Sequence, residues 1–254
     1  MEYVSFASSS SGNCALLRGG GVNLLVDAGI SMKRIRMNLR SLGLELEDLR
    51  GVLVTHEHAD HVAALEMLSK YTDLPFFMSP GTAGALLRAG KCAEKNLRPL
   101  GPELSLDLGE LRILGVPLMH DAAQPLGWRV EGEKSALAVL TDLGCLTEGV
   151  LAAARGCRFA VVECNHDVEL LRRGPYPPAL QRRILGDRGH LSNETGAELA
   201  CHLAENGAEA LLLGHLSREN NRPPLALAAV RRRVGEELRV SAAPWNEPSA
   251  IWRN

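Results

Sequence analysis

The chain has 254 residues, of which 46% are hydrophobic and 23% charged, a composition typical of a globular protein with a substantial core. The formal net charge is −2, so no overall basic field draws it to nucleic acid or membranes, and polyanion binding needs a local patch or bound metal. The start of the chain lacks signal-peptide features, no apolar run reaches ~18 residues, and none of the six cysteines forms a CxxC pair. We therefore expect a cytoplasmic protein with reduced thiols and no membrane partner.

The first half of the chain alternates short strand-like runs with helical patterns. Apolar runs bounded by Gly, Asn and Ser predict strands, and two serines are placed to cap helices. The predicted strands are Tyr3–Ala7, Cys14–Leu17, Val22–Val26, Gly51–Thr55 and Pro75–Met78. The predicted helices run from Ser31 to Gly43, over Val62–Lys70, and from Ser79 to Leu87.

The second half continues this alternation. Two hairpins are predicted, Leu104–Leu108 with Leu111–Val116 and Gly127–Glu131 with Ala136–Thr141. Further strands are predicted over Phe159–Glu163 and Ala210–Leu213, and helices over Thr147–Arg155, Asp167–Arg173, Pro178–Leu185, Asn193–Asn206 and Pro223–Val234. No linker divides the chain, so we expect one domain over residues 1–254, with mixed sheets covered by helices. The segment Gly174–Gly189, rich in proline and arginine, is the best candidate for an inserted functional loop.

The densest group of candidate ligands is the HEHADH segment at residues 56–61, where a predicted strand ends and a predicted helix begins. Side chains two apart in an extended segment share a face, so His56 and His58 can bind one ion. After the chain turns, Asp60 and His61 can reach a second ion nearby. Imidazole and carboxylate ligands suit zinc, manganese or iron and require no cysteine. The alternative, a charged loop in which Asp60 only caps a helix, accounts poorly for three histidines and an aspartate in six residues.

This segment resembles the HxHxDH signature of the metallo-β-lactamase superfamily. The resemblance implies the α/β fold of that group, an αββα sandwich of two mixed β-sheets flanked by helices. It also implies three further ligands, each following a strand. Candidates in the right order are His120 in PLMHD, Asp142 in LTDLG and His215 in LLLGHL. Taken singly, either histidine is equally compatible with an ordinary loop.

The resemblance also implies how these residues share two metal ions. One ion is expected on His56, His58, His120 and Asp142, and the other on Asp60, His61, His215 and the bridging Asp142. The expected cofactors are two Zn²⁺ or Mn²⁺ ions, with iron less favoured. Two such ions about 3.5–4 Å apart share a hydroxide, which attacks a phosphorus or carbonyl centre. Asp60 is expected to orient that hydroxide and accept its proton, which is a catalytic role.

Four further stretches resemble the bacterial YycJ/WalJ family within this superfamily. They are SFASSSSGN at Ser5–Asn13, ECNHD at Glu163–Asp167, GPYPPALQRRILGDRGHLSN at Gly174–Asn193 and GHLSREN at Gly214–Asn220. The resemblance implies a phosphodiesterase that acts as a 5′-to-3′ exonuclease on DNA rather than RNA, related to the β-CASP nucleases and the RNase J enzymes. Only 72 residues separate Asp142 from His215, too few for a β-CASP clamp domain, so RNA processing is not carried over.

The candidates for substrate contact lie in the same stretches. His190 resembles the β-CASP histidine that contacts the scissile phosphate, a catalytic role; the alternative is a surface histidine at a helix start. The arginines before it could neutralise phosphates or form a solvated helix face. The loop Ser8–Asn13 could offer backbone N–H groups to a phosphate or be an ordinary hairpin loop, and His166 could face the substrate or support the site. The substrate-binding candidates are Ser11, Asn13, His166, Arg182, Arg183, His190 and Ser192.

Two other functions share the same metal ligands. A hydrolase of small esters, thioesters or lactones would need an apolar pocket in place of an arginine-lined groove, because the ligands alone do not choose the substrate. A metal-stabilised binding or sensor protein without turnover is the non-enzyme alternative. A redox di-iron protein is less favoured, because the chain has no glycine motif for cradling the phosphates of a flavin.

Overall fold

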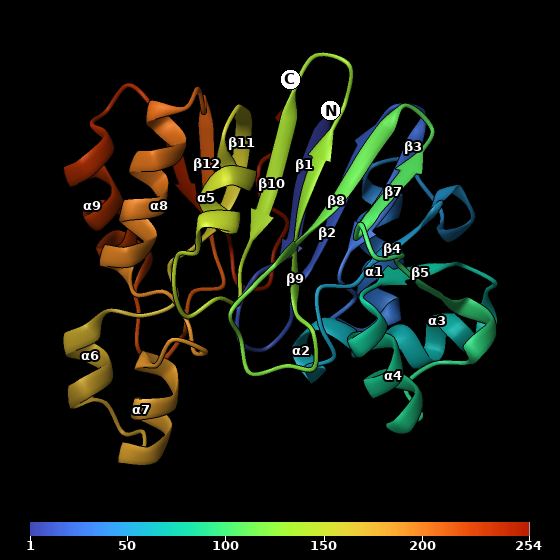
Figure 1. The fold of residues 1–254 in the computed structure, drawn as a ribbon, viewed down its shortest axis with the longest axis horizontal. Helices are drawn as coiled ribbons and strands as arrows, with labels where there is room; N and C mark the ends of the chain where they lie inside the picture. Colours follow the sequence, from blue (N-terminus) through green and yellow to red (C-terminus); the bar gives the residue numbers. More distant parts are fainter. Residues whose placement is uncertain (254) are drawn as a thin grey trace.

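The computed structural model describes residues 1–253, in which two β-sheets of seven strands each pack face to face with helices on their outer sides (Figure 1). This arrangement confirms the predicted sandwich of two mixed sheets. In strand order, the first sheet contains β14 (Trp252–Arg253), β1 (Glu2–Ala7), β2 (Cys14–Gly19), β3 (Val22–Val26), β4 (Gly51–Leu53), β5 (Phe76–Met78) and β6 (Leu97–Pro99). The second contains β13 (Arg239–Ala242), β12 (Ala210–Gly214), β11 (Cys157–Glu163), β10 (Ala136–Leu140), β9 (Leu126–Glu131), β8 (Leu111–Pro117) and β7 (Ser105–Leu108).

Each sheet combines an antiparallel part with a parallel part. In the first sheet, β1, β2 and β3 pair antiparallel, and β3, β4, β5 and β6 pair parallel. In the second, the strands from β7 to β10 pair antiparallel, and those from β10 to β13 pair parallel. The carboxyl ends of the parallel strands open onto one edge of the sandwich, the lower edge in Figure 1, where loops from both sheets meet.

The helices lie in three groups. One group covers the first sheet: α1 (Met32–Ser41), α2 (Ala59–Val62), α3 (Leu65–Tyr71) and α4 (Pro80–Arg88). The 3-10 turn η1 (Leu46–Asp48) follows α1, and η2 (Glu94–Asn96) follows α4. Another covers the second sheet: α5 (Glu148–Ala154), α8 (Asn193–Glu205) and α9 (Pro223–Val234). The helices α6 (Val168–Arg173) and α7 (Pro178–Leu185) extend beyond the lower edge of the second sheet (Figure 1).

The core forms three layers, one between the sheets and one under each helical face. Strand β10 shows why its sequence is continuously apolar. Leu137 and Val139 point into the layer between the sheets, whereas Ala138 and Leu140 point into the layer under the helices. Because side chains alternate along a strand, a strand covered on both faces needs apolar residues at every position.

The helix predicted over Val62–Lys70 differs from the structure, which has two short helices, α2 and α3. The backbone N–H of Ala64 donates to the carbonyl of Ala28, at 2.8 Å, instead of continuing the first helix. The carbonyl of Asp60 accepts from the N–H of Asn13, also at 2.8 Å. These tertiary bonds to loops distant in sequence break the helix beside the HEHADH segment.

Three short strands, β6, β13 and β14, are present in addition to the predicted ones. Each lies at or next to a sheet edge and has two to four residues, several of them polar, so no alternation could mark it. Among the described residues, no helix has both the length and the apolar character needed to cross a bilayer.

Candidate metal centre

The candidate ligands follow the carboxyl ends of strands from both sheets and meet at the lower edge of the sandwich. Within residues 1–253, four non-glycine residues have positive φ, and three of them lie here: Asp27 at 58°, Asp142 at 63° and His215 at 55°. A side-chain-bearing residue in this region costs of order 1–3 kcal/mol and persists only where its surroundings hold it. The chain thus turns sharply as it leaves β3, β10 and β12, directing these side chains inward.

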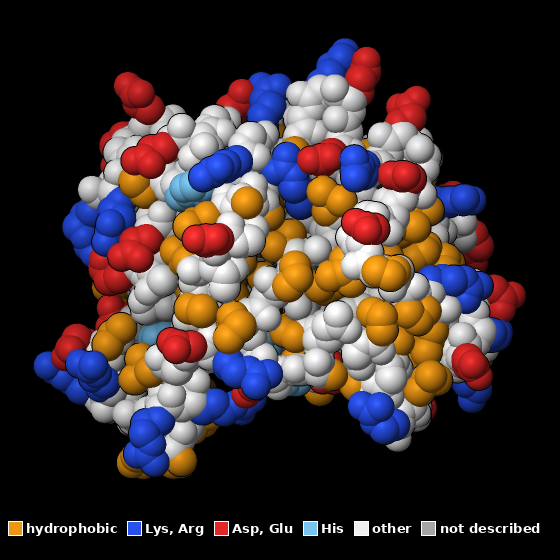
Figure 2. Space-filling model, in the orientation of Figure 1, with side chains coloured by type: hydrophobic (Ala, Val, Ile, Leu, Met, Phe, Trp, Pro, Cys, Tyr) orange, Lys and Arg blue, Asp and Glu red, His pale blue; other side chains and the backbone are white. Residues whose placement is uncertain are grey.

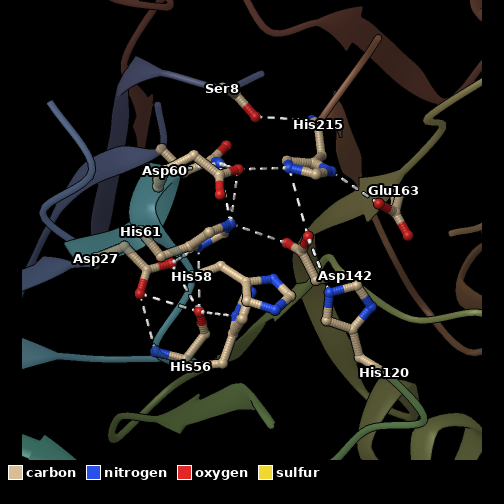
Figure 3. A network of polar contacts seen from close by, with 12 residues as sticks. Ser8, Asp27, His56, His58, Asp60, His61, His120, Asp142, Glu163 and His215 are labelled. Carbon is tan, nitrogen blue, oxygen red and sulfur yellow. Dashed lines mark hydrogen bonds and ion pairs between the residues drawn. The ribbon is translucent and has the colours of Figure 1, made fainter. Parts of the chain in front are cut away.

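Two groups of ligand atoms result. The first comprises His56, His58 and His120, and the second comprises Asp60, His61 and His215; within each group the atoms lie within 4.8 Å of one another. Asp142 lies between the groups (Figure 3). Its Oδ2 is 3.4 Å from His61 Nε2, and its Oδ1 is 3.4 Å from His215 Nε2 and 4.0 Å from His120 Nε2. All seven residues predicted as ligands therefore come together.

Several buried atoms that could coordinate a metal in this cluster have no hydrogen-bond partner among the described residues. They are Nε2 of His56, Nε2 of His120 and Oδ2 of Asp142. Leaving such groups unpaired costs about 1–3 kcal/mol each, more for a charged group, unless a cation satisfies them. A set of imidazole and carboxylate donors without thiolate suits zinc, manganese or iron. The cluster is therefore able to bind metal ions.

The electrostatics of the cluster favour cations as well. Burial alone would lower the pKa of His215, but the surrounding carboxylates, Asp142 foremost, raise it to about 10. Burial likewise opposes a charge on His61, and Asp142 again leads the carboxylates that raise its pKa well above the usual value. A field that keeps protons on two buried imidazoles also attracts divalent ions, which bind the neutral rings and release those protons.

The rings are oriented from behind, through their Nδ1 atoms. His61 Nδ1 is 2.7 Å from Asp27 Oδ2, and His56 Nδ1 is 3.0 Å from Thr55 Oγ1. Asp27 also accepts from the backbone N–H of Thr55, at 2.8 Å, so strands β3 and β4 are tied together beside the ligands. Contacts at Nδ1 leave Nε2 facing the cluster, the arrangement typical of metal-binding histidines.

Glu163, at the end of β11, orients two more rings. Its Oε1 lies 2.9 Å from Nδ1 of both His190 and His215, and its Oε2 accepts from the N–H groups of Leu143 and Leu191, each at 3.1 Å. Neither Glu163 nor Asp27 was predicted from the sequence as a site residue. The available signal was weak: Asp27 comes directly after the buried strand β3, and Glu163 is the last residue of β11 and begins the ECNHD stretch.

His190 lies beside the cluster, with its side chain 19% exposed. Its Nδ1 is held by Glu163, so Nε2 is the free ring nitrogen. Atoms of Asp142, Glu163, His190 and His215 also lie close enough together to hold an ion. His190 lines a hollow of about 170 Å³, bounded by Tyr176, Arg183 and Ser10, where a substrate group can approach.

Asn13 and Ser11 occupy different positions in the β1–β2 loop. The Asn13 amide Nδ2 is 3.0 Å from His61 Nε2 and 3.3 Å from Asp60 Oδ2, so this side chain touches two candidate ligands. Ser11 is exposed, and its N–H donates to Ser9 Oγ at 3.2 Å. The loop therefore contacts the cluster through Asn13 and presents Ser11 to solvent.

Some of the arginines before His190 contact the loop after β8, which contains His120 and Asp121. Arg183 forms an ion pair with Asp121, and Arg188 donates from Nε and Nη2 to the carbonyl of His120, at 3.1 and 3.0 Å. Arg182 is exposed on α7. Two of these arginines thus contact the strand end that carries His120, and Arg182 faces solvent.

Two substrate candidates remain, His166 and Ser192. His166 is buried, and Ser192 caps a helix. His166 is 1% exposed, and neither ring nitrogen has a partner among residues 1–253. Burial lowers its pKa to about 4. Ser192 is the N-cap of α8, where its hydroxyl accepts from the N–H of Thr195 at 3.2 Å. The structure does not bring these two side chains into the ligand cluster.

A fold of two seven-stranded sheets with this cluster at their shared edge defines a protein of the metallo-β-lactamase class, and the model of the beta-lactamase superfamily domain matches residues 22–216. The crystal structure of YhfI, a metallo-β-lactamase-fold protein from Bacillus subtilis, has the same fold. It aligns with a TM-score of 0.74 at 16% identity, covering 100% of this chain and 99% of that one.

Within that class, the chain belongs to the family of the exodeoxyribonucleases WalJ and YycJ. It is 35% identical over 230 residues to exodeoxyribonuclease WalJ of Streptococcus pneumoniae, covering 89% of this chain and 85% of that protein. It is 32% identical over 240 residues to exodeoxyribonuclease YycJ of Bacillus anthracis, covering 93% and 90%. The family resemblance seen in the sequence motifs is thereby confirmed.

Proposed function

We propose that the chain is a single-domain, two-metal phosphodiesterase that removes nucleotides from the 5′ end of DNA. The observation that carries the proposal is the pair of ligand groups joined by Asp142, in a chain of the exodeoxyribonuclease family. The first ion would bind His56, His58 and His120, and the second Asp60, His61 and His215, with Asp142 shared. Zn²⁺ and Mn²⁺ both suit these donors.

Divalent cations in such a site act as Lewis acids toward phosphoryl oxygens and lower the pKa of water toward about 7. The protein's own groups then orient the reaction. Asp60 is held by Asn13 and lies 3.4 Å from both His61 Nε2 and His215 Nε2, which suits it to orient a nucleophile and accept its proton. His190, fixed by Glu163, would offer Nε2 to a phosphate or leaving oxygen.

Contacts along the DNA would come from the surfaces around the hollow beside His190. Arg182 faces solvent on α7, and Arg183 borders the hollow while paired to Asp121. Phosphate contacts by arginine contribute affinity without sequence preference, which suits an exonuclease. Ser11 is proposed to meet the phosphate backbone from the opposite loop, whereas His166 and Ser192 would support the site.

The ester, thioester or lactone alternative fits these surroundings less well. The hollow beside His190 is bounded by the Arg183–Asp121 ion pair and by polar side chains such as Ser10, which suit a charged substrate better than an acyl chain. In the non-enzyme alternative, a metal-stabilised binding or sensor protein, Asp60 would bind metal and have no catalytic role. Turnover of thioesters or lactones with inert DNA would favour the first alternative, and full biological function of Asp60→Asn the second.

The test is an end-labelled oligonucleotide assay with chelated protein to which Zn²⁺ or Mn²⁺ is returned. We expect no cleavage after chelation, restored cleavage with metal, and early release of a 5′ label as mononucleotide. Matched DNA and RNA strands, single and double, define the preference. Full-rate cleavage by the metal-free protein would contradict the metal mechanism, and early release of a 3′ label would contradict the polarity.

A further inference from the structure

Two adjoining hollows lie on the outer surface formed by α1, η1, α3 and the β5 region, away from the metal centre. Their volumes are about 750 and 700 Å³. They share four lining residues, so they form one continuous depression, here called the methionine groove: Leu46, Glu47, Tyr71 and Thr72. None of the proposed metal ligands or substrate-contacting residues lines either hollow.

The groove gathers large apolar side chains that the fold leaves uncovered. Met37 and Tyr71 are each 59% exposed and Met67 is 43% exposed. These are three of the eight exposed large hydrophobic side chains among residues 1–253, and all three line the same hollow. Hydrophobic side chains gather on the half of the molecule that carries α3 and α4 (Figure 2). Single exposed apolar residues are ordinary, but a cluster in a depression marks a binding surface.

The same groove is positively charged, in contrast to the net charge of −2 for the chain. Its lining cations are Lys33, Arg36, Arg40, Arg50 and Arg98. Only two carboxylates line it, Glu47 and Asp73, and Asp73 is paired with Lys95 at 2.7 Å. Arg40 is likewise paired with Glu45, at 2.9 Å, which leaves four of the five lining cations without an ion pair among the described residues. Helix α1 carries four cations and no acidic residue. A binding partner therefore needs negative charge beside its apolar side chains.

We infer that the methionine groove docks an acidic amphipathic helix of a partner protein. Methionine side chains are flexible and polarisable, so they adapt to the apolar face of a bound helix. The surrounding cations would pair with carboxylates on the flanks of that helix, which sets its charge preference and speeds association. The inference is independent of the proposed nuclease function, because no site residue takes part.

Two other occupants fit the groove less well. A second copy of the chain in a twofold dimer would place the groove against itself, so its cations would repel one another. DNA would satisfy the cations, but its phosphate backbone has little apolar surface with which to cover Met37, Met67 and Tyr71. A peptide that combines carboxylates with apolar side chains satisfies both features together.

The test uses the full chain and a fluorescein-labelled helical peptide of about 18 residues, with Leu and Phe at i, i+3, i+4 and i+7 and Glu elsewhere. The control peptide has Lys in place of every Glu. One double variant, Lys33→Glu with Arg36→Glu, reverses the charge, and another, Met37→Ser with Met67→Ser, removes the apolar contacts. The matched control is Leu87→Ser with Lys91→Glu on and after α4, where Leu87 is also 43% exposed.

We expect fluorescence anisotropy to show binding of the Glu peptide with a Kd on the order of 10 µM and no binding of the Lys peptide. Both groove variants should weaken binding about tenfold, and the control variant should leave it unchanged. Absence of binding at about 200 µM, or equal weakening by the control variant, would overturn the inference. Competition by duplex DNA, or a dimer that the Met37→Ser, Met67→Ser variant converts to monomer, would assign the groove to another occupant and overturn it as well.

Discussion

At the scale of single residues, the buried Glu163 orients two histidine rings beside the metal centre. All four groups that meet its carboxylate are donors or ring nitrogens: Nδ1 of His190 and of His215, and two backbone N–H groups. Glutamine would place an NH₂ against two of them, a donor facing donors. We predict that Glu163→Gln lowers both metal affinity and the cleavage rate about 10–100-fold. Metal content in buffered metal solutions, measured beside the rate, checks this.

The matched comparison is His190→Ala. His190 shares the Glu163 oxygen but stands outside the proposed ligand set, with its side chain 19% exposed. We predict a loss of about 10²–10⁴-fold in rate, typical of a lost proton-transfer group, with metal content unchanged. A variant that loses metal would show instead that His190 is a ligand, in the group that it forms with Asp142, Glu163 and His215.

His166 makes a pH-dependent contribution to stability. Burial is the main reason that its native pKa falls to about 4, and the unfolded chain has a histidine pKa near 6.5. Between these values the unfolded state binds more protons than the native one, so stability declines as pH falls from about 6.5 toward 4. The loss is about 2 kcal/mol at pH 5.

Urea unfolding of chelated protein at pH 7 and pH 5 measures this effect. The wild-type chain should lose about 2 kcal/mol more than His166→Gln between the two pH values, because glutamine does not titrate. His202→Gln is the control, because it also replaces a histidine with glutamine, but at a position on α8 that is only half-buried. Equal pH dependence of wild type and His166→Gln would show that His166 is solvated in the native state.

At the scale of elements, helix α2 packs closely against Gly29, in the loop between β3 and α1. A Cβ at Gly29 would lie 1.6 Å from the carbonyl oxygen of Asp60, so this loop and α2 fit together only with glycine there. We predict that Gly29→Ala displaces the backbone of Asp60, destabilises the protein by about 2–4 kcal/mol, and weakens binding of the second metal ion. Denaturant midpoints and metal content measure both effects.

Gly101→Ala is the matched control for that change. A Cβ at Gly101 meets nothing within 4 Å, and this glycine has no positive φ, so the substitution should be nearly neutral. If Gly29→Ala were as stable as Gly101→Ala, the packing of the β3–α1 loop against Asp60 would have no part in the stability of the site.

The same elements explain what could be predicted from the sequence. The HEHADH segment could be found because it places three histidines and an aspartate within six residues. His120, Asp142 and His215 could be found because they follow predicted strands in the order that the family resemblance implies. Asp27 and Glu163 could not be assigned, since each touches a histidine 34 or 52 positions away. A single carboxylate at the end of a strand gives no indication in the sequence of such a contact. The split helix was missed because tertiary hydrogen bonds, not local propensity, end α2.

At the scale of the whole molecule, metal ions would join the two sheets. His56, His58, Asp60 and His61 follow a strand of the first sheet, whereas His120, Asp142 and His215 follow strands of the second. Ions bound across this junction stabilise the native state but not the unfolded chain, which cannot gather the ligands. The net charge of −2 does not reveal the cation-attracting metal centre, because it sums the charges of that centre with those of the basic groove beside α1.

Metal removal should therefore lower the melting temperature of the entire sandwich. At a free metal concentration about 1,000 times the Kd, binding adds about 4 kcal/mol, which corresponds to a shift of about 8–16 °C for a chain of this size. Calorimetry of the chelated protein across a metal titration measures the shift. Asp142→Asn should abolish most of it, because Asp142 contacts ligands from both sheets. A melting temperature independent of metal concentration in the wild-type protein would mean that the two sheets are held by the apolar layer between them alone.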